Sequence, residues 1–117
     1  MKKVLFFIFT VLVFLIAKAQ KSQDISYLKN GNKKYVAKKY ADAESEYNKI
    51  LPTKNNFETN YNLANAKFQQ KKYDEAIESY QRTIDLDDAT SYALLRIGKC
   101  YEKLGNKVEA LKYFNKT

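Results

Sequence analysis

The sequence contains no histidine, and it has only one cysteine, one proline and three glycines. Without histidine there is no Ser–His or Cys–His nucleophilic pair, and the commonest transition-metal ligand is missing. The single cysteine, Cys100, cannot form a disulfide within the chain, so packing must supply the stability. Three isolated glycines do not make a phosphate-binding loop. We therefore expect no cofactor and no metal site.

Paired carboxylates do not change this expectation. Asp74 and Glu75, like Asp87 and Asp88, are sequence neighbours, and such neighbours do not face each other on a helix. The first pair lies at a predicted helix start, where the helix dipole favours negative charge. Cys100 falls inside a predicted helix and is interpreted as a buried structural thiol. We predict that the protein is not an enzyme and has no catalytic residues.

The N-terminal segment 1–19 has the pattern of a secretory signal. Two lysines precede an apolar run over residues 4–16, and the small-residue sequence AKA follows at 17–19. This run is shorter than the roughly 20 residues that span a bilayer. The pattern predicts cleavage after Ala19, a short leader over residues 20–23, and a periplasmic or secreted protein. The alternative is an uncleaved anchor in the inner membrane, and we expect membrane contact only through this segment.

Charge is distributed unevenly along the rest of the chain. Without the three lysines of residues 1–19, the formal charge of +8 falls to +5. Residues 24–56 carry +3, residues 57–90 carry −3, and residues 91–117 carry +4. Three Lys-Lys-Tyr sequences interleave cations with aromatic rings, as nucleic-acid surfaces do. Because their lysines lie in predicted turns and two of their tyrosines in the predicted core, we expect no nucleic acid but a modest preference for acidic partners.

An internal repeat organises the chain after the signal. KKYDEAIESY at residues 71–80 is nearly the same as KKYADAESEY at residues 38–47, and a third copy aligns with them at residues 105–114. In each copy a small residue is followed twelve positions later by alanine and four positions after that by an aromatic residue. The copies are Gly31, Ala43 and Tyr47; Ala64, Ala76 and Tyr80; and Gly98, Ala110 and Phe114.

Each repeat unit is predicted to fold as two helices. Apolar residues from Tyr73 to Ile84 recur with helical periodicity, and residues 70–72 and 105–106 are predicted turns. Pro52 is predicted to end the second helix of the first unit. Small residues let helices approach closely, aromatic residues fill the space between units, and the pairs stack into a superhelix. The side chains expected near helix starts are Asp24, Asp74 and Ser91.

This pattern resembles the tetratricopeptide repeat, a helix–turn–helix unit of about 34 residues. The residues that carry the resemblance are Tyr27, Gly31, Tyr35, Tyr40, Ala43 and Tyr47; Leu63, Ala64, Phe68, Tyr73, Ala76 and Tyr80; and Ile97, Gly98, Tyr101, Ala110 and Phe114. The resemblance implies an all-α, right-handed solenoid of antiparallel helix pairs. Its units would be residues 24–56, 57–90 and 91–117. Because the third stops part-way along its second helix, we expect either a longer protein or a partner that covers this end.

The resemblance also implies where a partner would bind. In this family the first helix of each unit lines a concave groove that holds a peptide or protein. Amides can donate and accept hydrogen bonds with a peptide backbone, tyrosine combines apolar area with a polar tip, and arginine can hold a carboxylate by two bonds. The candidate groove residues are Lys29, Asn32, Tyr35, Tyr61, Asn62, Asn65, Phe68, Tyr92, Arg96 and Lys99.

Some family members bind the C-terminal carboxylate of a chaperone with two lysines, two asparagines and an arginine. Asn32, Asn62 and Arg96 match three of these positions, but Leu28 and Tyr92 stand at the lysine positions. We therefore do not expect chaperone-tail binding.

The hypothesis is a non-catalytic adaptor of the bacterial cell envelope, whose partner is a protein or peptide with acidic or C-terminal carboxylate groups. The alternative is a membrane-anchored structural subunit whose repeats self-associate. Within the family, the chain is similar to the repeat proteins of bacterial aerotolerance operons. It shares with them the signal, an early Gly-Asn step and aromatic-rich repeats.

Overall fold

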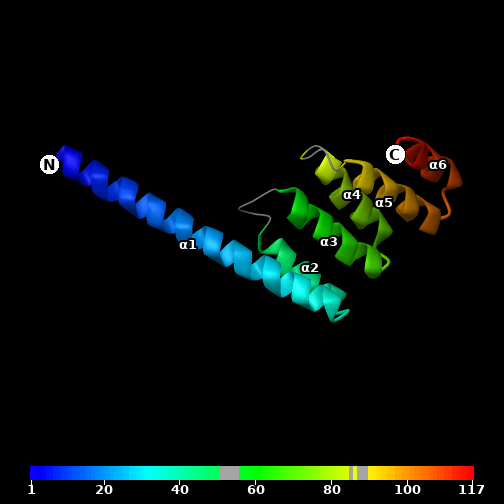
Figure 1. Ribbon diagram of the computed structural model, residues 1–117, viewed down its shortest axis with the longest axis horizontal. Helices are drawn as coiled ribbons and strands as arrows, with labels where there is room; N and C mark the ends of the chain where they lie inside the picture. The colour runs from blue at the N-terminus through cyan, green and yellow to red at the C-terminus, as the bar shows by residue number, and fades with distance from the viewer. Residues whose placement is uncertain (51–55, 85, 87–89) are drawn as a thin grey trace.

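The computed structural model describes residues 1–50, 56–84, 86 and 90–117. The described part of the chain forms six helices and no strand, so the predicted all-α class is confirmed (Figure 1). Pro52 and the pair Asp87 and Asp88 lie outside the described residues. The helices are α1 (Lys2–Val36), α2 (Tyr40–Asn48), α3 (Phe57–Gln69), α4 (Tyr73–Ile84), α5 (Thr90–Lys103) and α6 (Lys107–Asn115).

The helices form three antiparallel pairs that stack side by side. The C-terminal part of α1 pairs with α2, α3 with α4, and α5 with α6, while α2 packs on α3 and α4 on α5 (Figure 1). This neighbour-to-neighbour packing is that of a repeat solenoid. Asp74 and Ser91 lie in the first turns of α4 and α5, as predicted.

The three turns within the pairs share one conformation. Lys38, Lys71 and Gly105 have positive φ values of 61°, 63° and 80°. In each turn the next residue donates its backbone N–H to a carbonyl five residues earlier, as in Asn106 to Tyr101 at 2.9 Å. This is the Schellman ending of a helix, which needs a left-handed residue. The turns predicted at residues 70–72 and 105–106 are thereby confirmed.

Small residues on the first helices allow close packing of the aromatic residues on the second helices. A Cβ atom placed on Gly31 would lie 2.4 Å from Cε1 of Tyr47, and one on Gly98 would lie 2.5 Å from Cε1 of Phe114. Tyr47 also belongs to a buried cluster with Leu63 of the next unit. The ring therefore packs both on its own unit and on the next one, which explains the repeated small–aromatic spacing.

Helix α1 differs from the prediction because it runs without a break from Lys2 into the first repeat. Asp24 was expected near a helix start, and this is wrong. It lies inside α1, is 5% exposed and accepts a hydrogen bond from Gln20 Nε2 at 3.0 Å. The segment 1–30 contains neither proline nor glycine, so nothing in the sequence interrupts the helix.

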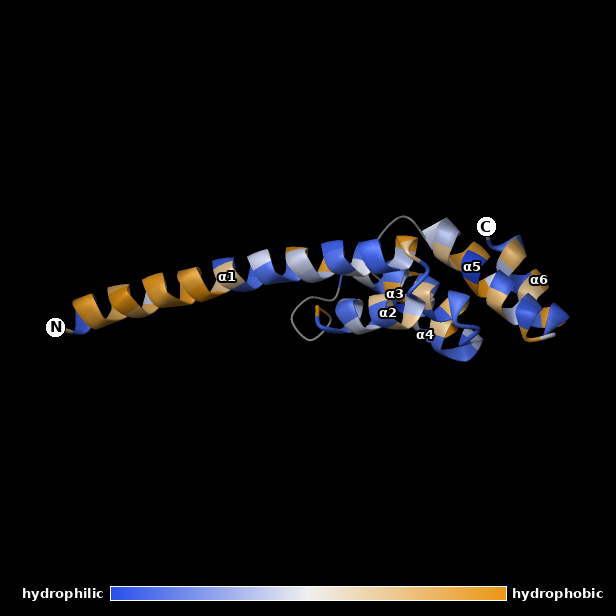
Figure 2. Cartoon of the chain, turned by 90° about the horizontal axis from the view of Figure 1, so that it is seen from below, coloured by the Kyte–Doolittle hydropathy of each residue, from blue (hydrophilic) through white to orange (hydrophobic). Residues whose placement is uncertain are grey.

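The N-terminal half of α1 extends away from the repeats and is strongly apolar (Figure 2). Its large side chains are exposed, including Phe6 at 70% and Phe14 at 70%. By length and composition this helix could cross a membrane, and its most apolar window is not buried against the rest of the protein. A signal sequence near an N-terminus has the same properties, so cleavage after Ala19 stays a prediction.

Candidate functional site

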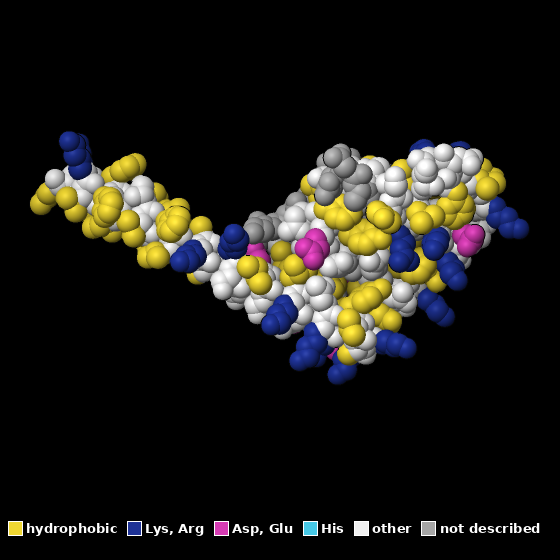
Figure 3. All heavy atoms as spheres, in the orientation of Figure 1, with side chains coloured by type: hydrophobic (Ala, Val, Ile, Leu, Met, Phe, Trp, Pro, Cys, Tyr) yellow, Lys and Arg dark blue, Asp and Glu magenta, His cyan; other side chains and the backbone are white. Residues whose placement is uncertain are grey.

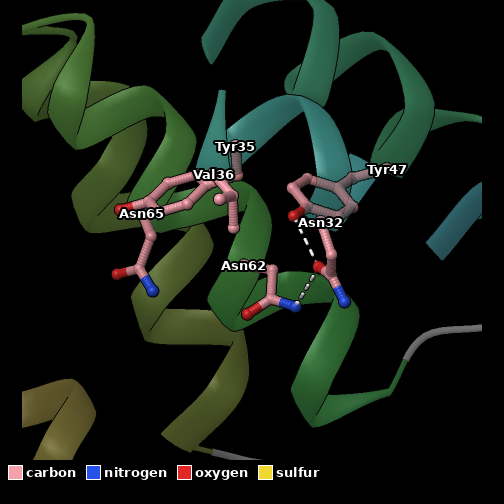
Figure 4. A pocket seen from close by; sticks show the side chains of 6 residues that line it. All are labelled: Asn32, Tyr35, Val36, Tyr47, Asn62 and Asn65. Atoms are coloured by element: carbon pink, nitrogen blue, oxygen red, sulfur yellow. Dashed lines mark hydrogen bonds between the residues drawn. The ribbon is translucent and has the colours of Figure 1, made fainter. Parts of the chain in front are cut away.

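A hollow of about 260 Å³ opens on the first two repeat units (Figure 4). Residues of α1 and α3 line it, together with one tyrosine of α2. Six residues line it: Asn32, Tyr35 and Val36 of α1, Tyr47 of α2, and Asn62 and Asn65 of α3. Four of the ten predicted groove residues are therefore together in one hollow.

Two hydrogen bonds fix the amide of Asn32. Tyr47 Oη donates to Asn32 Oδ1 at 2.7 Å, and Asn62 Nδ2 donates to the same oxygen at 3.2 Å (Figure 4). Because two donors converge on this oxygen, the amide nitrogen of Asn32 is turned away from them. Within the described part of the chain, the two N–H donors of the Asn32 amide and the carbonyl of the Asn62 amide make no hydrogen bond and can serve a ligand. The hollow thus offers both hydrogen-bond donors and an acceptor to a peptide backbone.

The second unit repeats this arrangement. Tyr80 Oη donates to Asn65 Oδ1, across the same separation of 15 residues as Tyr47 and Asn32. Burial, with smaller contributions from Tyr35 and Glu58, raises the pKa of Tyr47 to about 12. Burial also raises the pKa of Tyr80. Both hydroxyls therefore keep their protons and act as donors throughout the physiological pH range.

Sequence reasoning assigned Tyr47 and Tyr80 to the core alone and missed their contact with the groove. Both rings are buried, as predicted. A signal was available, because a buried tyrosine hydroxyl needs a hydrogen-bond partner and a phenylalanine would pack equally well. In both units the partner stands 15 residues earlier, in the first helix of the same unit.

A second cluster joins the second and third units. The guanidinium carbon of Arg96 lies 5.8 Å from the centre of the Phe68 ring, and the ring of Tyr61 packs edge-to-face on Tyr80 at 5.6 Å. Burial lowers the pKa of Arg96, but a hydrogen bond with Tyr61 and electrostatic interactions with Tyr80 and Tyr61 outweigh this effect, so the pKa is raised. Arg96 is a fixed cation, and three predicted residues meet here.

The other three predicted residues do not join either cluster. Lys29, Tyr92 and Lys99 are exposed, and they make no hydrogen bond or ion pair with any described residue. Tyr92 is 66% exposed. Leu28, at one of the expected lysine positions, is instead packed against the cluster that contains Tyr47. Two cations of the carboxylate-binding set are therefore missing from this groove.

The single cysteine, Cys100, lies in a buried core cluster that also contains Tyr80 and Ile97. Burial is the main cause that raises the pKa of the Cys100 thiol to about 12, and its side chain is fully buried. This confirms the structural role predicted for it. Among the residues that the structure describes, no group of three or more histidine, cysteine, aspartate or glutamate side chains could hold a metal ion.

The fold and the repeated packing define an all-α repeat protein, and sequence comparison identifies the family. Residues 55–117, more than half of the chain, match the model of the tetratricopeptide repeat. The chain belongs to the tetratricopeptide repeat family. The mouse protein DnaJ homolog subfamily C member 7 is 32% identical over 92 residues, which are 78% of this chain. The chain spans about a fifth of that relative, because the match covers 19% of it.

Solved structures of the same family superpose well. The second TPR domain of Spaghetti (RPAP3), bound to the HSP90 peptide SRMEEVD, is 31% identical with a TM-score of 0.74. The alignment covers 84% of this chain and 94% of that one. The TPR domain of Arabidopsis FLU is 24% identical with a TM-score of 0.76, and the alignment covers 83% of this chain and 92% of that one. The second likeness bears on the fold alone.

Proposed function

We propose that this protein is a non-catalytic adaptor that holds an extended segment of another protein in the groove formed by α1, α3 and α5. The observation that carries the proposal is the pair of buried tyrosine hydroxyls that fix the groove amides. Groups held in advance lose little conformational freedom when a ligand binds, which favours affinity. The similar Spaghetti domain bound to a peptide supports the same use of the groove.

The chemistry of the groove suits an extended peptide. Each residue of such a peptide presents a carbonyl and an N–H group. Asn32 offers donors and Asn62 an acceptor to them, and Tyr35 adds apolar surface in the same hollow. Leu28 and Tyr92 supply no charge where a C-terminal carboxylate would need it. We therefore propose a segment of a partner protein as the ligand, rather than a chaperone tail.

We further propose that the adaptor works in the bacterial cell envelope. The exposed apolar half of α1 supports this location, because it suits either export or insertion into a bilayer. A second candidate follows from the continuity of α1. If the helix is retained, it joins the repeats to the membrane without a flexible linker, as in an anchored structural subunit. N-terminal sequencing of the purified protein separates the two, since a start at Gln20 excludes the anchor and a start at Met1 supports it.

A retention experiment tests the groove. The full chain, solubilised in a non-ionic detergent, is immobilised and exposed to an envelope extract. The double variant Asn62→Ala/Arg96→Ala should retain its partner protein several-fold less well. The control Asn48→Ala/Arg82→Ala makes the same two changes at exposed positions of α2 and α4 and should retain the partner fully. Circular dichroism confirms that both variants are folded. Equal retention by the two variants would refute the groove assignment.

A further inference from the structure

The third unit breaks the asparagine–tyrosine pattern of the first two. When the three units are aligned on their small and aromatic residues, Lys99 takes the place of Asn32 and Asn65, and Phe114 takes the place of Tyr47 and Tyr80. Phe114 packs over Gly98 as Tyr47 packs over Gly31. The packing is therefore preserved, but the hydroxyl and the amide that it orients are both gone.

The exchange extends along the side of α5 that corresponds, by the repeat alignment, to the side of α3 that lines the hollow. Asn62, Asn65 and Gln69 of α3 correspond to Arg96, Lys99 and Lys103 of α5, so each of three amides is replaced by a cation. Positions three, four and seven residues apart share one face of a helix. The cations therefore form one row, called here the α5 cation row. Figure 3 shows lysine and arginine side chains at the surface of this end of the molecule.

The α5 cation row is not neutralised within the described part of the chain. Lys99 is exposed and forms no ion pair, although Glu102 lies three residues away on the same helix. Arg96 is fixed by Phe68 and Tyr61. The described lysines that do form ion pairs are Lys49, Lys72 and Lys112, and all of them lie outside this row. An external anion would therefore complete it.

We infer that the groove has a polarity: it takes a neutral stretch of the partner segment over α1 and α3, and acidic side chains of the same segment over α5. This inference rests on the proposed function and adds the chemistry of the ligand. The adjoining amides of α3 can bond to a peptide backbone, which favours an acidic peptide over a nucleic acid. Lys99 is then the residue that determines specificity, because it takes the place of the tyrosine-held amides Asn32 and Asn65 and forms no ion pair with any described residue.

Selection from a displayed library of short random peptides tests the inference on the full chain in detergent. Peptides retained by the unaltered protein should be enriched in aspartate and glutamate in one terminal half. Lys99→Asn should lower their affinity about two- to five-fold, as expected for a partly exposed ion pair. The double variant Lys99→Asn/Phe114→Tyr restores the asparagine–tyrosine pair of the first two units and should select peptides with a weaker acidic bias, because only Arg96 and Lys103 of the row remain. The control Lys71→Asn removes one charge in a turn where asparagine readily adopts the left-handed conformation and should change nothing.

The outcomes separate this inference from the proposed function. If the unaltered protein and Asn62→Ala/Arg96→Ala both retain no peptide above the bare matrix, the groove itself is refuted. If peptides are retained through Asn62 but carry no acidic bias, or if Lys99→Asn leaves the bias intact, the polarity is wrong. A short single-stranded oligonucleotide serves as a competitor. If it binds more tightly than the selected peptides and loses affinity with Lys99→Asn, the α5 cation row serves nucleic acid and the inference is overturned.

Discussion

The hydrogen bond between Tyr47 and Asn32 links the core to the groove. It can be removed by deleting one oxygen atom, the hydroxyl oxygen of Tyr47. Tyr47→Phe keeps the ring in place over Gly31, so it creates no cavity. A hydrogen bond between uncharged groups contributes about 0.5–1.5 kcal/mol net. Asn32 Oδ1 would still accept from Asn62, so no acceptor is left unpaired. We expect the free energy of unfolding to fall by about 1 kcal/mol.

A double-mutant cycle isolates this hydrogen bond. Urea unfolding of the full chain in detergent is measured for the unaltered protein, Tyr47→Phe, Asn32→Ala and the double variant. The two changes should be non-additive by about 0.5–1 kcal/mol, because the second one removes a bond that the first has already broken. Tyr27→Phe is the matched control: its hydroxyl accepts an exposed bond from Gln23, so its loss should cost less than about 0.5 kcal/mol.

Additivity is the result that would refute the reasoning. If the coupling energy lies within the roughly 0.3 kcal/mol that independent sites show, the hydroxyl of Tyr47 does not hold Asn32. The amide would then be free to rotate, and the groove would not be preorganised. The same cycle on Tyr80 and Asn65 should give a similar coupling, because the second unit repeats the geometry.

Three further predictions test the packing and the buried groups. Gly31→Ala places a Cβ against the buried Tyr47 ring and should lower the free energy of unfolding by about 1–3 kcal/mol, as measured by urea unfolding. An unchanged free energy of unfolding would show that the ring does not lie over Gly31. Cys100, whose pKa is raised to about 12 by burial, should react with Ellman's reagent at pH 8 only after urea is added, and rapid labelling of the folded chain would contradict this. The pKa of Tyr47 is raised from 10.0 to about 12, so the stability that its neutral form contributes is complete below pH 10. This stability declines between pH 10 and 12, because only the unfolded state then releases the proton. The decline should be shallower in Tyr47→Phe, and parallel curves would contradict the shift.

Repeat spacing made most of the fold predictable. A small residue, an alanine and an aromatic residue at fixed distances fix the contact between the two helices of a unit, so three copies predict three stacked pairs. The turns followed as well, since Gly105 is suited to a positive φ. Lys71 has the same positive φ although it is not a glycine, and only its alignment with Gly105 in the repeat predicts this conformation. The continuity of α1 was not predictable in this way. The boundary at Ala19 was inferred from a cleavage motif, and such a motif does not determine where a helix begins or ends.

The residues that line the hollow could be predicted from the sequence, but their contacts could not. The spacing of the family placed Asn32, Tyr35, Asn62 and Asn65 on one surface, and they do line one hollow. It could not tell which amide bonds to which, since that depends on side-chain orientation across 15 or 30 residues of sequence. The packing of Leu28 against the core could not be predicted either, because it depends on how the helices pack in three dimensions.

The core and the groove of this protein are therefore not separable. One face of the Tyr47 ring packs on Gly31, while its hydroxyl orients Asn32 toward the hollow. A phenylalanine at this position would pack on the glycine but has no hydroxyl to hold an amide. The third unit has Phe114 at this position, and Lys99 stands where the other units have asparagine. Once the aromatic residue loses its hydroxyl, the matching position on the first helix of the unit no longer needs an acceptor and can carry a charge. We infer that the identity of the buried ring decides whether each unit carries an oriented amide or a cation on its first helix.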